Sequence, residues 1–200
     1  MIATLLAMCV LLTLGSTARE CWSSSLQGAR RCATSTNKGK APWKPAVYQS
    51  LRMGRSRRSD VLRVLGPPDF IEAVGGKRPE IWYTYKRRGE FGGDLVVVLG
   101  NRNEVVLAVE ERLWQRGISV EEVIRRFGED CVVTRYDFDD CLGDGESSPV
   151  FESDDGPLEV LEYRDRGIAI FYNFEGKVDS IEYLDGPVGT KSSRCARRVK

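Results

Sequence analysis

Carboxylate side chains crowd one short segment of the chain, and their types and spacing are the first sign of possible chemistry. The five are Asp137, Asp139, Asp140, Asp144 and Glu146. Gly143 and Gly145 lie among them, and hard cations such as calcium bind clustered oxygen ligands on loops bent by glycine. The spacing does not fit the loop of an EF-hand, so a solvated acidic loop is the plainer interpretation. A calcium site and a hydrolase that uses two carboxylates both stand as hypotheses.

The 200-residue chain contains no histidine, which removes the commonest general base and metal ligand. Ser-His-Asp and Cys-His catalysis are therefore excluded. Residues 35–38 match the S-x-x-K pattern of penicillin-recognising enzymes, but they lie outside any helical pattern and lack the partner motifs. We therefore expect a protein that is not an enzyme and needs no cofactor, with calcium as the one exception under consideration.

The net charge is only +1, but basic and acidic residues occupy different parts of the chain. Eleven basic residues lie between positions 19 and 63 against two acidic ones, whereas twelve acidic residues lie between positions 130 and 165 against two basic ones. A candidate basic patch is formed by Arg52, Arg55, Arg57 and Arg58. Such a patch attracts anionic surfaces. An envelope structural factor that holds lipid headgroups or an acidic envelope polymer is therefore the alternative function.

The first eighteen residues have the pattern of a cleaved signal peptide. Residues 2–14 are almost wholly apolar, and Ser16 and Ala18 are the small residues that signal peptidase requires. The apolar run is too short to span a bilayer comfortably, and no later segment could do so. An N-terminal membrane anchor or a wrongly assigned start is the alternative. We expect an exported protein, periplasmic or secreted, without a transmembrane segment once the signal is removed. Export argues against nucleic acid as a partner.

Five cysteines follow the predicted cleavage site, and an oxidising compartment favours their pairing. Cys131 and Cys141 flank a short polar loop and form the first predicted disulfide, and Cys21 with Cys32 forms the second. Cys195 is then free or intermolecular, because five cysteines cannot all pair within one chain. Five unpaired thiols are the alternative.

Two segments, 59–66 and 121–128, share the pattern of a short helix that ends in glycine. Val120, Val123, Ile124 and Phe127 recur at the spacing that lines one helical face. Ser119 and Glu122 predict a capping box at the start of the second helix. The glycine at the end of each segment supplies the left-handed backbone of a C-terminal cap.

Each predicted helix is followed by three runs rich in aromatic and β-branched residues, which indicate strands. The runs are 80–86, 94–99 and 104–109 after the first helix, and 159–164, 168–174 and 177–183 after the second. Tyr85 and Gly89 recur with the same spacing as Tyr163 and Gly167. The order of helix and strands and the positions of the glycines both repeat, so the sequence predicts a duplicated unit.

The predicted fold class is α+β, with two tandem helix-plus-antiparallel-sheet units and the helices packed on one face of the sheet. The expected divisions are 1–18 as signal peptide, 19–50 as flexible basic arm, 51–114 and 115–186 as the two units, and 187–200 as basic tail. The other face of each sheet is expected to be partly open.

Aromatic residues on the predicted strands are the candidate binding residues. They are Trp82, Tyr83, Tyr85, Tyr163 and Tyr172. Alternate strand residues face opposite sides, so some of these side chains belong to the core. Those on the open face would suit a protein interface, because aromatic residues anchor many interfaces.

Residues 117–128 resemble a known motif, G-[MI]-[TS]-x-x-[EQ]-V-x-x-x-[LF]-G. The motif is shared by the SmpA/OmlA-type outer-membrane assembly lipoproteins and by the β-lactamase inhibitor proteins, which carry the unit in tandem. Residues 54–66 match it less well, with one extra residue before Val61, although the ending at 65–69 is typical. The resemblance covers roughly residues 54–183.

Two details favour the tandem, inhibitor-like version of this resemblance. Cys131 lies just past the second helix, where the inhibitor proteins also staple a loop with a disulfide, and no lipid-attachment cysteine is evident. The resemblance implies a scaffold for protein recognition, and it implies neither a β-lactamase target nor any contact residue. The sequence thus predicts an exported, non-enzymatic protein-binding module, inhibitor-like or an envelope-assembly accessory, that uses an exposed sheet face and loops.

Overall fold

The structure, a computed structural model, describes residues 42–75, 79–100, 104–137, 158–188 and 197–198. The elements in chain order are β1 (Val47–Tyr48), β2 (Leu51–Arg52), α2 (Arg58–Leu65), β3 (Phe70–Val74), β4 (Glu80–Tyr85), β5 (Asp94–Leu99), β6 (Val106–Arg112), α3 (Val120–Phe127), β7 (Val132–Asp137), β8 (Leu158–Tyr163), β9 (Ile168–Tyr172), β10 (Val178–Leu184) and β11 (Arg197–Arg198). Most of these elements are strands.

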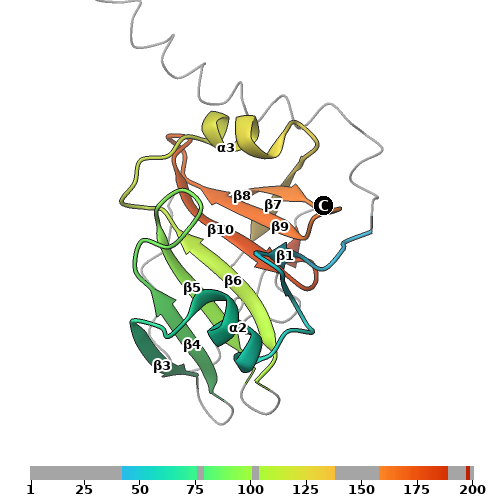
Figure 1. Cartoon of the computed structure of the whole chain (residues 1–200). Coiled ribbons are helices and arrows are strands. Elements are labelled where there is room, and N and C mark those ends of the chain that lie inside the picture. Colours follow the sequence, from blue (N-terminus) through green and yellow to red (C-terminus); the bar gives the residue numbers. More distant parts are fainter. Residues whose placement is uncertain (1–41, 76–78, 101–103, 138–157, 189–196, 199–200) are drawn as a thin grey trace, which may run out of the picture.

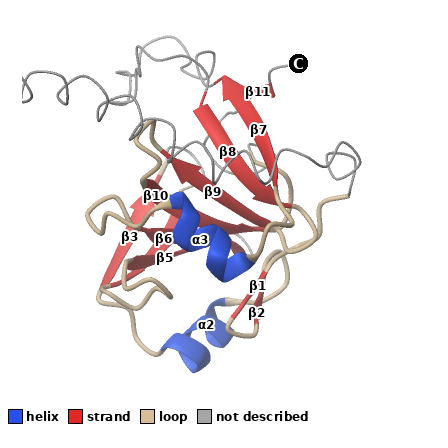
Figure 2. Ribbon diagram, turned by 90° about the horizontal axis from the view of Figure 1, so that it is seen from above, coloured by secondary structure: helices blue, strands red, loops and turns tan. Residues whose placement is uncertain are grey.

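One antiparallel sheet holds all strands except β1 and β2, which form a small hairpin of their own. The order across the sheet is β11-β7-β8-β9-β10-β6-β5-β4-β3. β6 and β10 pair in its middle, from Ser180 opposite Arg112 to Leu184 opposite Ala108. Strands that are far apart in the sequence therefore share one continuous sheet, and both helices and the β1–β2 hairpin lie on one side of it (Figure 2).

Both helices begin and end close to where the sequence predicts. In α3 the Oγ atom of Ser119 accepts a hydrogen bond from the backbone N–H of Glu122 at 3.2 Å, which confirms the Ser119 half of the predicted capping box. Gly66 and Gly128 follow the helices with φ angles of 76° and 90°, a conformation that glycine adopts without strain. No helix in the described ranges is long and apolar enough to cross a lipid bilayer.

The predicted fold class is wrong. The described part of the chain is mostly β, with one long sheet and two helices of eight residues each, not two helix-plus-sheet units. The sequence pattern did not predict β3 and β7, the strands that directly follow the helices. Membership of a sheet depends on pairing with a neighbour as much as on the local pattern. The β6–β10 pairing, which joins the strands into a single sheet, has no local signature either.

The central strands of the sheet are buried on both faces. The main core packs Val61 of α2 and Val123 of α3 against the sheet. A second apolar cluster lies on the opposite face and contains Val160, Ala169, Phe171, Leu184 and Val188. Ile170 and Phe171 are adjacent in β9 but belong to different clusters, as the alternation of a strand requires. The expectation of an open sheet face therefore fails at β9 and β10.

The described part of the predicted arm, residues 42–50, packs onto the sheet. The backbone N–H of Lys44 donates to Arg164 O and that of Ala46 to Leu184 O, both at 2.8 Å. Tyr48 is buried in the main core. The folded part of the chain thus begins before residue 51, and residues 19–41 of the predicted arm lie outside the described residues.

Candidate functional site

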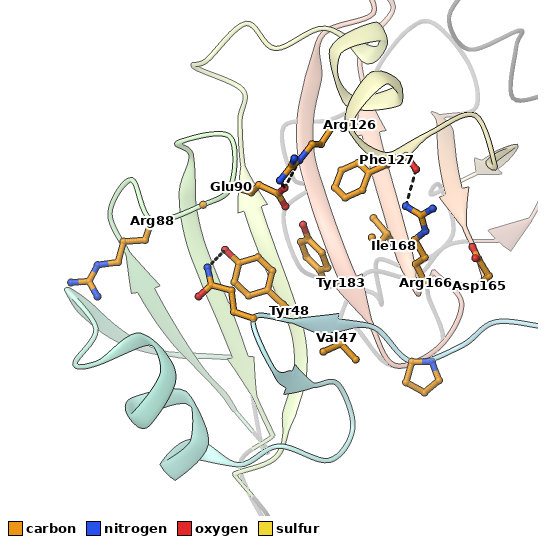
Figure 3. A pocket seen from close by; sticks show the side chains of 13 residues that line it. Val47, Tyr48, Arg88, Glu90, Arg126, Phe127, Asp165, Arg166, Ile168 and Tyr183 are labelled. Carbon is orange, nitrogen blue, oxygen red and sulfur yellow. Dashed lines mark hydrogen bonds and ion pairs between the residues drawn. The ribbon is translucent and has the colours of Figure 1, made fainter.

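A cleft of about 660 Å³ lies where the end of α3, the β4–β5 loop and β1 meet (Figure 3). Its walls come from residues 45–49, 88–90, 126–127 and 165–168, and Tyr183 of β10 contributes from the sheet. The lining combines aromatic rings, guanidinium groups and carboxylates. Five segments that are distant in sequence build it, so the sheet and the helix ends determine its shape.

Two tyrosine rings form the floor of the cleft. The rings of Tyr48 and Tyr183 pack edge to face, with centroids 4.9 Å apart and planes at 65°. The Tyr48 hydroxyl accepts a hydrogen bond from Nε2 of Gln49 at 3.4 Å. The Tyr183 hydroxyl is buried, and the Glu90 carboxylate raises its pKa both by charge and by a side-chain hydrogen bond. It points towards Glu90 and Arg126 at the mouth of the cleft (Figure 3).

Both phenols stay protonated well into the alkaline range. Burial raises the pKa of Tyr48 to about 12, and the nearby carboxylates of Glu111 and Glu90 act in the same direction. Burial also raises the pKa of Tyr183, again with help from Glu90 and Glu111. The carboxylates of Glu90 and Glu111 thus oppose the ionisation of both phenols.

A buried carboxylate shapes the β4–β5 loop that presents Glu90. Glu111 of β6 is fully buried and accepts hydrogen bonds from the backbone N–H groups of Glu90, Phe91 and Gly93, at 2.8, 2.7 and 3.1 Å. Burial raises the pKa of Glu111, and the three N–H donors oppose that rise. A Cβ atom at Gly89 would lie 2.2 Å from Oε1 of Glu111, so the loop closes tightly around this side chain.

Arg126 of α3 bridges the mouth of the cleft to this loop. Its Nε atom donates to Oε1 of Glu90 at 2.6 Å. Phe127, the next residue, packs between Phe91 and Tyr163, with ring centroids 6.1 and 5.7 Å away. The wall on the α3 side is thereby held in place by ring contacts and one ion pair.

Two further arginines hold the helix ends. Arg166 donates to Phe127 O at 2.7 Å, at the C-terminus of α3, where the helix dipole places negative partial charge. Arg88 donates in the same way to Leu65 O at 2.6 Å, at the C-terminus of α2. The side chain of Arg88 points away from the cleft (Figure 3). Both guanidinium groups are therefore already engaged in hydrogen bonds to the helix C-termini.

Four of the five predicted aromatic binding residues are core residues. Tyr83, Tyr85, Tyr163 and Tyr172 are buried, and Trp82 alone is partly exposed. The four tyrosines belong to the core on the helix-covered face of the sheet. Trp82 faces the other side, because it alternates with Tyr83 and Tyr85 along β4. The sequence could not distinguish the two faces of the strand. The interpretation of these four tyrosines as surface contacts is corrected accordingly.

The predicted basic patch surrounds the start of α2. Arg52, Arg55, Arg57 and Arg58 are all exposed. Arg58 pairs with Glu104 at 3.2 Å and lies over the ring of Tyr83. No ion pair is found for the other three within the described part of the chain. The patch is separate from the cleft and presents its guanidinium groups to solvent.

The predicted calcium loop falls largely outside the described residues. Only the backbone of Asp137, the last residue of β7, is described, and Asp139, Asp140, Asp144 and Glu146 are not. The residues that are described contain no group of three or more acidic or cysteine side chains placed to hold a metal ion. The calcium hypothesis for the loop stays a prediction.

The predicted disulfides also lie mostly outside the described residues. Cys131 is fully buried, whereas Cys21, Cys32, Cys141 and Cys195 are not described. Cys131 is disulfide-bonded, and its partner lies outside the described residues. The Cys131–Cys141 and Cys21–Cys32 pairings stay predictions.

The residues that carry the cleft's charges are not among the site residues predicted from the sequence. Glu90, Arg126 and Arg166 lie in a loop, on a polar helix face and in a turn, positions that look merely solvated. The repeated spacing of Tyr85–Gly89 and Tyr163–Gly167 was the available signal, since both glycines mark loops at the cleft or beside it. Comparison with known proteins adds nothing further: no protein-family model matches the chain, and no curated protein or solved structure is significantly similar to it.

Proposed function

We propose that this chain is an exported protein-binding module and that its binding surface is the cleft between α3, the β4–β5 loop and β1. The observation that carries the proposal is the composition of the cleft: aromatic rings on the floor, with arginines already held by fixed contacts around it. Aromatic residues and arginine are enriched at the cores of protein interfaces. Groups that are held in place before binding lose little conformational entropy when a partner arrives.

An exposed apolar side chain at the edge of the cleft supports a macromolecular partner. Val47 of β1 lines the cleft and is 57% exposed, directly beside the buried Tyr48. A partner that covered Val47 would extend the contact beyond the floor and over β1. The proposed surface replaces the sheet face that the sequence suggested, because that face is buried at β9 and β10.

The test is site-specific photocrosslinking in an envelope extract of the source organism. A photoreactive residue is placed at Val47, and the control places it at Phe174, an apolar side chain of the β9–β10 hairpin that is 73% exposed. We expect one protein to crosslink stoichiometrically at Val47 and not at Phe174. Equal adducts at both positions, or none at Val47, would contradict the proposal.

A further inference from the structure

We infer that the outer edge of β3 is a second binding surface, which takes up an extended strand of another protein with a lysine or arginine opposite Glu72. The sheet ends differently on its two sides. At one side β11 pairs with β7, with Arg197 opposite Asp137. At the other side β3 is the last strand, and among the described strands it pairs with β4 alone (Figure 1). The outward backbone groups of such an edge can pair with a further strand.

Large apolar side chains are exposed on both faces of this edge. Phe70 is 56% exposed and Ile71 58% exposed, although both lie in the paired part of β3. Phe70 is opposite Thr84 and Ile71 is opposite Tyr83, so the two side chains lie on different faces of the sheet. An added strand would cover both side chains, and its main-chain hydrogen bonds would supply much of the affinity.

β3 lacks the features that protect many edge strands. Its pairing with β4 runs from Phe70 opposite Thr84 to Val74 opposite Glu80 without a bulge, and the strand contains neither proline nor lysine. Proline, lysine and bulges are common devices that keep an edge from pairing. Glu72 is the one charged residue of β3, so its charge decides which strands can pair there.

Glu72 lies in an acidic part of the sheet face that turns away from the helices. Trp82 is directly opposite Glu72, and its Nε1 atom donates to Oε2 of Glu80 at 3.1 Å. Glu72 and Glu80 are therefore diagonal neighbours on one face. Neither carboxylate forms an ion pair with another described residue. Both would attract a cation placed opposite Glu72.

Two cations near this edge are already paired with other carboxylates. Arg112 contacts Glu110 at 3.4 Å, and Lys86 bonds to Asp94 at 2.6 Å. Their charged groups lie over aromatic rings of β4 and β3. An incoming lysine or arginine thus meets the carboxylate of Glu72 without displacing either of them.

The charge of Glu72 also argues against a second copy of this chain as the occupant. Two β3 strands paired antiparallel in full register would place Glu72 directly opposite Glu72 and Phe70 opposite Val74. Like charges directly opposite each other destabilise a strand pair. Glu72 therefore disfavours self-association and selects a basic partner strand at the same position.

The test titrates the full chain with short blocked peptides and follows backbone amide chemical shifts. The probe is acetyl-Thr-Val-Arg-Val-Tyr-amide, which in an antiparallel register places arginine opposite Glu72 and tyrosine opposite Phe70. The control peptide has glutamate in place of arginine. We expect the arginine peptide to shift the amides of residues 70–74 and to bind about three- to tenfold more tightly than the control. No shift at residues 70–74, or equal affinity of the two peptides, would overturn the inference.

Three variants identify the groups responsible. Glu72→Lys should reverse the preference, so that the glutamate peptide binds more tightly, and an unchanged preference would contradict the role of Glu72. Ile71→Lys places a charge on the edge and should abolish binding of both peptides. Phe174→Lys is the matched control, because Phe174 is an exposed apolar side chain of the β9–β10 hairpin, away from β3, and should leave binding unchanged.

Two outcomes would assign the edge or the peptide differently. A dimer in sedimentation equilibrium that Ile71→Lys dissociates would make this edge an interface between two copies and would overturn the partner strand. Peptide shifts at the cleft in place of residues 70–74 would overturn the second surface and leave the proposed function standing. Crosslinking at Val47 should be the same in Ile71→Lys, because β3 does not line the cleft.

Discussion

The C-terminal ends of α2 and α3 are held by the same pair of contacts. After α2, the Tyr85 hydroxyl donates to Gly66 O at 3.1 Å and Arg88 donates to Leu65 O at 2.6 Å. After α3, the Tyr163 hydroxyl donates to Gly128 O at 2.7 Å and Arg166 to Phe127 O at 2.7 Å. Each arginine also lies over the ring of its tyrosine, at 5.4 and 5.7 Å. We call each of these sets of contacts a helix-end clamp.

The loops beside the two clamps are built differently. Gly89 closes against the buried carboxylate of Glu111, whereas Gly167 closes against backbone, with Lys44 O and Ala46 N within 2.5 Å of the position of a Cβ atom. Both loops bring an acidic residue to the cleft, Glu90 from the loop at Gly89 and Asp165 from the loop at Gly167. The comparison teaches that the same helix-end clamp serves both helices, while the loops beside the clamps are closed by different contacts.

The largest expected effect comes from adding a methyl group at Gly167. Gly167→Ala should destabilise the protein by roughly 3 to 4 kcal/mol, because backbone crowding adds to the strain of its φ angle of 69°. Gly89→Ala should cost somewhat less, since the Glu111 side chain can shift where backbone cannot. Urea unfolding measures both.

Gly117→Ala is the control for this pair. Gly117 has a φ angle of 65° and nothing within 4 Å of an added Cβ, so it reports the backbone strain alone, about 1 to 2 kcal/mol. If Gly167→Ala lowers the free energy of unfolding no more than Gly117→Ala does, residues 44–46 do not pack closely against the turn at Gly167.

An intermediate loss of stability is expected from Glu111→Gln, which removes contacts that only the loop at Gly89 makes. Glutamine offers one acceptor oxygen where Glu111 receives three N–H donors, and its amide group would oppose one of them. We expect a loss of about 2 to 3 kcal/mol and faster hydrogen exchange at the amides of residues 90, 91 and 93. The amides of residues 44 and 46 should keep their exchange rates, and equal acceleration there would contradict a local role.

The smallest effect concerns the clamp tyrosines themselves. Tyr85→Phe and Tyr163→Phe each remove one hydrogen bond to a helix-end carbonyl and should each cost about 1 kcal/mol in urea unfolding. Similar values at the two positions would support equivalent clamps. A cost at only one position would show that the clamps differ in strength as well as in their neighbouring loops.

Ionisation of the same tyrosines should lower the stability of the protein at alkaline pH. Burial raises the pKa of Tyr85 and of Tyr163 to about 12, whereas an unfolded tyrosine ionises near 10. The folded state therefore binds these protons more tightly, so their contribution is present below about pH 10 and is lost as the pH rises towards 12. Unfolding followed from pH 9 to 12 should show this decline, and Tyr163→Phe should make it shallower.

Much of the local structure could be read from the residues alone. Contacts between residues close in the sequence determine the cap at Ser119, the helix ends at Gly66 and Gly128 and most of the six predicted strands. These features lie where the sequence predicted them. β3 and β7 were missed, because five or six residues with a mixed pattern become a strand only beside a partner. The face to which Tyr83 or Tyr163 points could not be decided without knowing which side the helices cover.

The sequence by itself determined the short helices, their caps, the run of strands and the absence of histidine, since each follows from composition or from contacts within a few residues. Only the tertiary structure decided that β6 pairs with β10, that the central strands are buried on both faces, and that Glu90, Arg126 and Tyr183 meet at one cleft. The physical reason is that strand pairing and the convergence of distant side chains depend on non-local contacts, which produce no periodic pattern in the sequence.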